Sequence, residues 1–202
     1  MKARQTEIAN CAEVLPGCSL NTYARHDPSG SHQVILGKHL LMSGLSLPGM
    51  GYRYHPEHEL RVTPRGKVEK YSVKAGDVLL VSRGLRNHAV WIESVPEKTI
   101  ASATFYLLRV HHGIEPAYFA WLLNQAPTQN RIAQIRTSAG TPIIQRKLFT
   151  ELIIPLPSYE DQCKIAKLGA CMVKERILRQ TLVERTEQLY RLIGERLIGN
   201  LA

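Results

Sequence analysis

The stretch that most constrains the fold is residues 149–166, FTELIIPLPSYEDQCKIA. The short apolar run Leu152–Leu156 has the length and composition of a buried strand. Pro155 and Pro157 interrupt the run, because proline fixes φ and keeps the preceding residue out of the α region. Ser158, followed by Asp161, has the spacing of a capping box at a helix N-terminus. The pattern predicts a globular region that ends at residue 157 and a long helix from residue 158, although the same spacing also fits an ordinary strand-to-helix linker.

Length and composition limit the class of protein. A chain of 202 residues with 44% hydrophobic residues can form one domain with an appendage, or two small domains. No apolar run approaches the roughly 18 residues that cross a bilayer, so we expect no membrane segment. The N-terminal residues MKARQTEIANCAEV lack an apolar signal core, and four cysteines fit reduced thiols, so we expect a cytoplasmic protein.

The basic charge lies mainly in the globular region. Residues 1–157 hold 18 Lys and Arg against 11 Asp and Glu, a balance of +7, and residues 158–202 hold 8 against 6, a balance of +2. A basic domain favours an anionic partner, and nucleic acid is the most common one. Basic proteins that bind nothing specific are also frequent, so charge alone leaves both interpretations open.

The periodicity predicts a mixture of strands and helices. Strands are expected at Val78–Ser82, Ala89–Ile92 and within Ala101–Val110, where Phe105 and Leu107 should face away from Tyr106 and Leu108. A helix should begin at Pro116, and a second helical piece should follow Pro127. Residues 1–33 show little pattern. This mixture predicts an α+β fold.

Residues 158–197 read as one continuous helix with a seam at 3-4 spacing in which six of nine positions are apolar, and the three polar positions argue against a simple, highly stable zipper. A helix of about 40 residues is about 60 Å long, which is more than one small domain can cover. We therefore expect a second helix beside the seam, in a coiled-coil-like dimer or partner contact. The apolar seam positions singled out are Leu168, Leu178, Leu182, Leu189 and Leu192.

No catalytic motif is present in the sequence. A GxxxxGK[ST] phosphate loop, a GxSxG motif, a Pro-Pro pair and a Glu-x-Lys arrangement are all lacking. His55 and His58 have metal-ligand spacing, but two such residues in a polar segment are few for a metal site, so we predict neither a metal nor catalysis.

Three segments, at residues 52–54, 83–88 and 136–141, have the composition of a DNA-reading surface. Arg, Asn and small hydroxyl side chains read base edges, and basic residues contact phosphates. Ordinary solvated loops share this composition, so a solvated loop that binds no ligand is the alternative for each segment. The predicted DNA-binding residues are Arg53, Tyr54, Arg83, Arg86, Asn87, His88, Arg131, Arg136, Thr137, Ser138 and Thr141.

The stretch 149–166, here called the joint, connects the globular region to the long helix. It closely resembles the connection between the target recognition domain and the conserved helix in specificity (S) subunits of Type I restriction–modification systems. The resemblance is firm between about residues 74 and 168 and weak before residue 74. It includes the basic-x-Gly-Asp-apolar strand at Lys74–Leu80, the helix Pro116–Leu123 and the loop Gly140–Ile144. At the joint it rests on Ile153, Ile154, Pro155, Leu156, Pro157, Glu160, Gln162, Lys164, Ile165 and Ala166.

The resemblance implies a DNA target recognition domain at residues 1–157, with a mixed sheet, and a helical region for dimerisation and partner binding at residues 158–202. It implies a non-catalytic subunit that directs a DNA methyltransferase, and a restriction subunit where one exists, to specific double-stranded DNA in phage defence. S-adenosylmethionine is expected on the methyltransferase and no cofactor on this chain.

Family members usually carry two recognition domains, whereas this chain has one. We therefore expect a half-subunit that forms a homodimer through its helix, and a palindromic target, because a two-fold interface repeats the same contacts. A split gene product that needs a different second half is the alternative. Two further readings are a stand-alone DNA-binding regulator and a helical adaptor with an incidental basic face.

Overall fold

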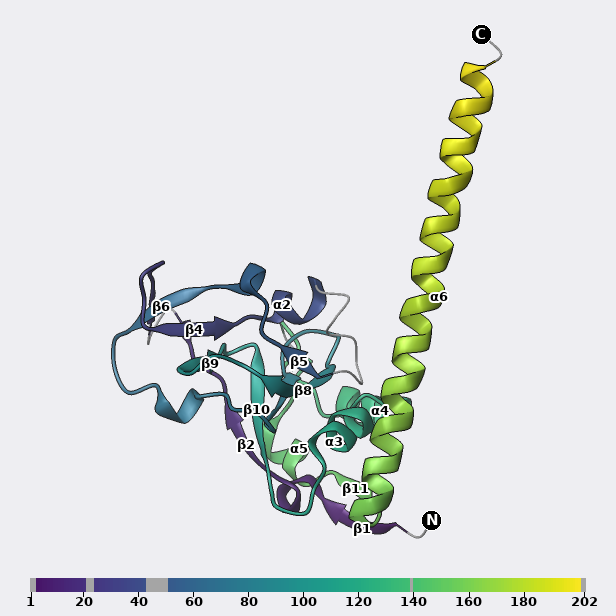
Figure 1. The fold of residues 1–202 in the computed structure, drawn as a ribbon. Coiled ribbons are helices and arrows are strands. Elements are labelled where there is room, and N and C mark those ends of the chain that lie inside the picture. Colours follow the sequence, from purple (N-terminus) through teal and green to yellow (C-terminus); the bar gives the residue numbers. More distant parts are fainter. Residues whose placement is uncertain (1–2, 21–23, 43–50, 139, 201–202) are drawn as a thin grey trace.

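The computed structural model describes residues 3–20, 24–42, 51–138 and 140–200. It contains a mixed-sheet domain and one long helix that starts at the base of the domain and extends far beyond it (Figure 1). Among the described helices, none is both long enough and apolar enough to cross a lipid bilayer. The expected α+β architecture is confirmed.

The central sheet of the described residues has the strand order β2-β10-β7-β8-β5 and is mixed, because β5 runs parallel to β8 and the other neighbours are antiparallel. The strand β7, predicted from the VLLV run, is buried along its whole length at the centre of this sheet. The strands are β2 (Ala12–Pro16), β5 (Tyr52–Arg53), β7 (Val78–Val81), β8 (Ala89–Ser94) and β10 (Phe105–Val110).

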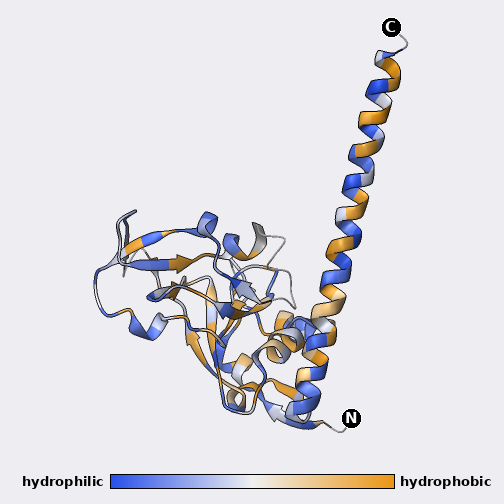
Figure 2. Ribbon diagram, viewed as in Figure 1, coloured by the Kyte–Doolittle hydropathy of each residue, from blue (hydrophilic) through white to orange (hydrophobic). Residues whose placement is uncertain are grey.

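Each face of the central sheet packs against a separate core. On one face, Tyr106 and Leu108 join a cluster completed by the helices, and on the other face, Phe105 and Leu107 join Tyr52 and its neighbours. The predicted alternation along β10 is therefore confirmed. Figure 2 shows that apolar residues concentrate in this part of the domain. The helices of the first face are α3 (Pro116–Leu123), α4 (Ala126–Gln134) and α5 (Arg146–Thr150).

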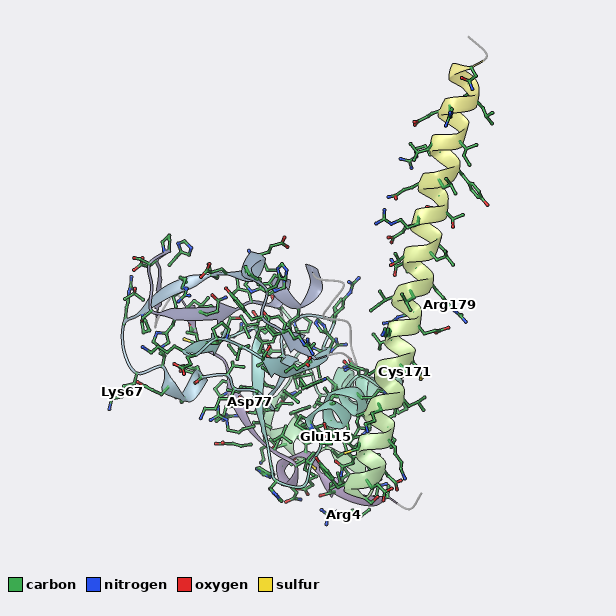
Figure 3. All side chains as sticks on the ribbon, in the orientation of Figure 1. Arg4, Lys67, Asp77, Glu115, Cys171 and Arg179 are labelled. Atoms are coloured by element: carbon green, nitrogen blue, oxygen red, sulfur yellow. The ribbon has the colours of Figure 1, made fainter. Side chains whose placement is uncertain are left out.

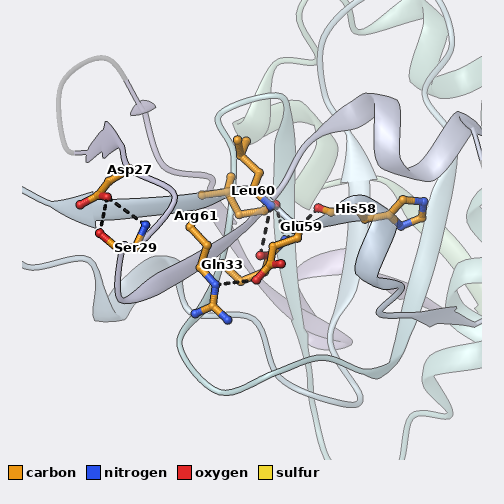
Figure 4. Close-up of polar contacts among 8 residues, drawn as sticks. Asp27, Ser29, Gln33, His58, Glu59, Leu60 and Arg61 are labelled. Carbon is orange, nitrogen blue, oxygen red and sulfur yellow. Dashed lines mark hydrogen bonds and ion pairs between the residues drawn. The ribbon is translucent and has the colours of Figure 1, made fainter.

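A second sheet, of order β3-β6-β4-β9, extends the domain on the side away from the long helix (Figure 1). Its core contains Val34, Val62 and Ile100. The amide of Gln33 is buried there and ties two segments together: Nε2 donates to His58 O at 3.0 Å, and Oε1 accepts from Leu60 N at 3.2 Å (Figure 4). The strands are β3 (Ala24–His26), β4 (His32–Ile35), β6 (Arg61–Pro64) and β9 (Thr99–Ala101), and helix α2 (Gly37–Met42) follows β4.

The joint forms a strand followed by a helix, as the sequence predicts. Strand β11 (Ile153–Leu156) pairs antiparallel with β1 (Arg4–Glu7), and α6 (Tyr159–Gly199) begins after Pro157 with Ser158 as its N-cap. Pro155 lies within β11 rather than interrupting it, and Ile153 is 48% exposed, so the expected buried strand is buried on one face only. The Ser158 hydroxyl accepts a hydrogen bond from Asp161 N at 3.2 Å, which caps the helix.

The first turns of α6 belong to the domain. Gln162 is buried: its Oε1 accepts from Glu115 N at 2.9 Å, and its Nε2 donates to Pro157 O at 3.1 Å. Gly169 lies against the indole of Trp121 so closely that a Cβ there would be 2.3 Å from Cδ1. In Figure 3, Glu115 lies beside the base of α6, whereas Cys171 and Arg179 lie further along the helix. These contacts fix the direction in which the helix leaves the domain.

Sequence periodicity missed several short elements. Strands β1, β2 and β3 fall within the poorly patterned first 33 residues, and α5 lies in the segment before the joint. Each spans three to five residues, which is too short for a period to be visible. The second helical piece begins at Ala126, so Pro127 lies in its first turn rather than before it.

Candidate nucleic-acid interface

The loop at residues 83–88 joins the end of β7 to the start of β8. Its turn uses Gly84 at φ +87°, a left-handed conformation that favours glycine. The buried side chain of Asn87 closes the loop from inside, because Nδ2 donates to Val81 O at 2.9 Å and to Gly84 O at 3.3 Å. The Gln129 amide donates to Asn87 O at 2.8 Å, so α4 also supports the loop.

A second loop, at residues 137–142, lies directly against the first. Gly84 N donates to Pro142 O at 2.8 Å, and a single bridge pairs Arg83 with Ile143. Within the second loop, Thr137 Oγ1 accepts from Ile143 N at 3.0 Å. Two segments more than 50 residues apart in the sequence therefore form one surface.

Arg136 connects the two loops. Its Nη1 donates to Leu85 O at 2.9 Å and to Asn87 Oδ1 at 3.3 Å, and its Nε donates to Ala133 O at 3.3 Å. These contacts use much of the guanidinium to brace the 83–88 loop. Sequence composition predicts that Arg136 contacts DNA, which stays a prediction, and the structure shows that Arg136 braces the 83–88 loop.

The predicted DNA-binding residues of this surface differ in how far their side chains are exposed to solvent. Arg83, Arg86, Thr137, Ser138 and Thr141 are exposed, and the Arg83 Nε donates to Ala103 O at 3.0 Å. Asn87, in contrast, is 2% exposed and has its amide engaged with the backbone. The expectation that Asn87 reads a base edge conflicts with this burial, because a side chain that closes its own loop does not face a ligand.

A depression of about 520 Å³ lies beside the 83–88 loop. Lys38, from α2, adds a cation to its wall, and Thr104 adds a hydroxyl; neither had a local sequence signal, because the tertiary fold alone brings them to the loop. Burial, and to a lesser degree the Arg86 cation, lowers the pKa of His88, which favours its neutral form. His88 Nε2 has no hydrogen-bond partner within the described part of the chain.

The predicted segment around Arg53 and Tyr54 lies elsewhere. Arg53 pairs with Ser94 at the C-terminal end of β8, whereas the 83–88 loop enters the N-terminal end at Ala89. Five residue steps along a strand separate these ends by about 17 Å. The Arg53 guanidinium contacts the Glu93 carboxylate, whose pKa this hydrogen bond lowers. Arg53 and Tyr54 therefore do not join the two loops.

Arg131 is also separate from the loops. Its Nη1 donates to the carbonyl of Ile153 in β11, and its side chain lines a depression near the joint together with Trp121 and Pro155. This position of Arg131 favours a role in holding α4 against β11. The prediction that Arg131 contacts DNA would need a surface different from the one formed by the two loops.

Of the two histidines at positions 55 and 58, only His58 is buried, and Pro56 and Glu57 between them are exposed. His58 is 8% exposed and its ring stacks on His39, with centroids 5.3 Å apart and an interplanar angle of 3°. Tyr52 OH lies 3.4 Å from His58 Nδ1. Stacked rings do not converge their nitrogens on one point, and no group of three metal-ligating side chains occurs among the described residues.

The seam of α6 is exposed. Its five leucines, at positions 168, 178, 182, 189 and 192, are between 54% and 68% exposed in the single chain. Apolar and polar residues alternate along the free part of the helix (Figure 2). An apolar face of this extent is a marker of an interaction surface.

Comparisons with known proteins identify the fold. No family model and no curated protein match this sequence. Solved structures do match. The HsdS subunit from Thermoanaerobacter tengcongensis superposes with a TM-score of 0.57 at 15% identity, over 88% of this chain and 38% of that chain.

Two other structures agree. The S subunit of a Type I restriction–modification system from M. genitalium has a TM-score of 0.56 at 13% identity, over 94% of this chain and 44% of that one. A chain from a structure on the assembly and conformational transition of the type I R-M system has a TM-score of 0.63 at 16% identity, over 94% and 43%. This chain thus spans about two fifths of their length.

The fold is therefore a mixed-sheet domain followed by a long helical arm. More particularly, it is the fold found in S subunits of Type I restriction–modification systems, domain and arm together.

Proposed function

We propose that this chain is a DNA specificity subunit of a Type I restriction–modification system that carries a single recognition domain. The observation that carries the proposal is the likeness of the fold to these Type I restriction–modification structures over 88–94% of the chain. A fold alone does not define a function, so the surface must supply independent support.

That support comes from the two converging loops. Arg83 and Arg86 are exposed on a rigid loop, beside the hydroxyl residues of the 137–142 loop, and Lys38 adds a further cation. Cations set the register on phosphates, and arginine donates two hydrogen bonds to guanine in the major groove. A good bidentate pair discriminates between bases by about 1–3 kcal/mol. The recognition mechanism is positioning rather than catalysis.

The exposed arm supports the assembly part of the proposal. Two copies that pair through the α6 seam would together approach the length of one of the S subunits above and would present two recognition domains to a palindromic site. The assembled dimer would guide a DNA methyltransferase that binds S-adenosylmethionine, and a restriction subunit where the system has one. This chain would supply no catalytic group.

Affinity purification of the tagged full chain from its own host, under mild conditions and with mass spectrometry, tests the proposal. A stoichiometric companion that carries an S-adenosylmethionine loop and a Pro-Pro-aromatic motif is the expected result, and light scattering on the same sample counts the copies. Recovery of the chain alone as a homodimer that binds specific DNA would overturn the methyltransferase-guiding role and support a stand-alone regulator. Weak, sequence-independent and steeply salt-dependent DNA binding would support the helical adaptor.

A further inference from the structure

The tip of the 83–88 loop carries an exposed apolar side chain. Leu85 is 76% exposed, the highest value among the large apolar side chains of the described residues. The other exposed large apolar side chains lie on α6, α5 and β11. Leu85 instead stands alone at the end of a loop.

The loop holds Leu85 in a fixed position. Its own carbonyl accepts from Arg136 Nη1 at 2.9 Å, and the preceding Gly84 is bonded through its N–H to Pro142 O at 2.8 Å. The Asn87 amide closes the loop from within. A leucine on a loop braced in this way can contact a partner with little further loss of conformational freedom.

The surroundings of Leu85 select the chemistry of that partner. Arg83 and Arg86 flank it and are exposed, and neither the 83–88 loop nor the 137–142 loop contains an acidic residue. A partner that uses both features is anionic and offers an apolar group at its surface. Duplex DNA meets both conditions, because thymine exposes its 5-methyl group in the major groove beside the phosphate backbone.

We propose that Leu85 is a specificity-determining residue that packs against the 5-methyl group of a thymine in the major groove. This inference rests on the proposed DNA-recognition function and extends it by naming one base that the surface prefers. Leucine has no hydrogen-bonding group, so on a base edge it can favour only an apolar feature. Arg83 and Arg86 position the leucine by their contacts with the DNA backbone and neighbouring bases.

The test starts from a duplex that the full-length protein selects from a randomised pool. Each thymine is then replaced in turn by deoxyuridine, which lacks only the methyl group, and affinity is measured by fluorescence anisotropy at fixed salt. We expect one replacement to weaken binding about fourfold, the equivalent of one buried methyl-sized group. Leu85→Ala should bind the thymine duplex about as weakly and should no longer respond to that replacement.

Leu148→Ala is the matched control, since Leu148 is also exposed but lies on α5; its affinity and its thymine dependence should equal those of the unmodified chain. The inference is overturned if Leu85→Ala keeps specific binding and the same thymine dependence. It is also overturned if deoxyuridine has no effect while 2-aminopurine fluorescence reports an unstacked step, because Leu85 would then act as a wedge. Failure of the pool to yield any preferred sequence would instead contradict the proposed function itself.

Discussion

Arg136 donates a hydrogen bond from its guanidinium to the backbone carbonyl of Leu85 at 2.9 Å, across 51 residues of sequence. The same group reaches Asn87 Oδ1 at 3.3 Å. One arginine therefore braces the 83–88 loop, while Arg83 and Arg86 within that loop are exposed. This arrangement separates Arg136, which braces the loop, from the exposed arginines, to which the proposed function assigns contact with DNA.

Arg86→Ala and Arg136→Ala should differ in their effect on folding. The exposed Arg86 makes no bracing contact among those described, so its loss should change the free energy of unfolding by less than about 0.5 kcal/mol. Removal of Arg136 should cost about 1–2 kcal/mol, because the Leu85 and Asn87 oxygens lose their donor. Both variants should weaken specific DNA binding. Urea denaturation and anisotropy measure the two effects.

Lys67→Ala is the charge-matched control for that pair, since Lys67 is exposed on the part of the domain far from α6 (Figure 3). It should remove one cation without loss of sequence preference. Unchanged affinity of both arginine variants for the same DNA would show that the two-loop surface is not the site.

Gly169→Ala should destabilise the docking of α6, although alanine is the better helix former. The new Cβ would lie 2.3 Å from Trp121 Cδ1, so the helix or the indole must move. Overpacking of this kind costs about 1–3 kcal/mol. Gly194→Ala is the control: nothing lies within 4 Å of its Cβ position, and the change should stabilise the helix by up to about 1 kcal/mol. Stabilisation by both variants in urea titrations would contradict the observed packing.

Leu182→Glu, combined with Leu178→Glu, should convert the proposed dimer to a monomer. These side chains are 68% and 60% exposed in the single chain, so the folded domain should keep its thermal stability while the paired seam loses its apolar contact. Sedimentation or light scattering gives the mass. Gln180→Glu, on the opposite side of the helix, should leave the dimer intact. A dimer that survives both leucine changes would exclude pairing through this seam.

Acidification should destabilise the fold through His39. Burial, aided by the neighbouring His58 and Lys38, lowers the pKa of His39 from 6.5 to about 4, so the folded protein holds the ring neutral. Between these pH values the unfolded chain binds more protons, so stability should be fully present above about pH 6.5 and should fall as the pH drops toward 4. The loss should amount to as much as about 3 kcal/mol.

Urea titrations at pH 7.5 and pH 5 check this prediction, with His39→Gln as the comparison. The glutamine variant cannot take up the proton, so its stability should depend less on pH over this interval. An equal pH dependence in both proteins would assign the effect to His58, whose pKa burial also lowers, or to another group.

Local sequence patterns determined the long elements of this protein. The β7 run, the alternation along β10, the strand-to-helix order of the joint and the Ser158 cap depend on neighbours within a few residues, and all four appear in the structure. The chain's basic charge and the 3-4 spaced leucines of α6 are likewise visible without a fold.

Only the tertiary structure decided which polar residues share a surface. Composition could not distinguish the exposed Arg86 from the buried Asn87 one position later, nor reveal that Arg53 lies at the opposite end of β8 from the 83–88 loop. Gly169, which looks like a weak point in a helix, proves to be the place where α6 meets Trp121. Such relationships arise from contacts between segments that are distant in the sequence. Local sequence patterns, which depend only on residues close together in the chain, cannot predict them.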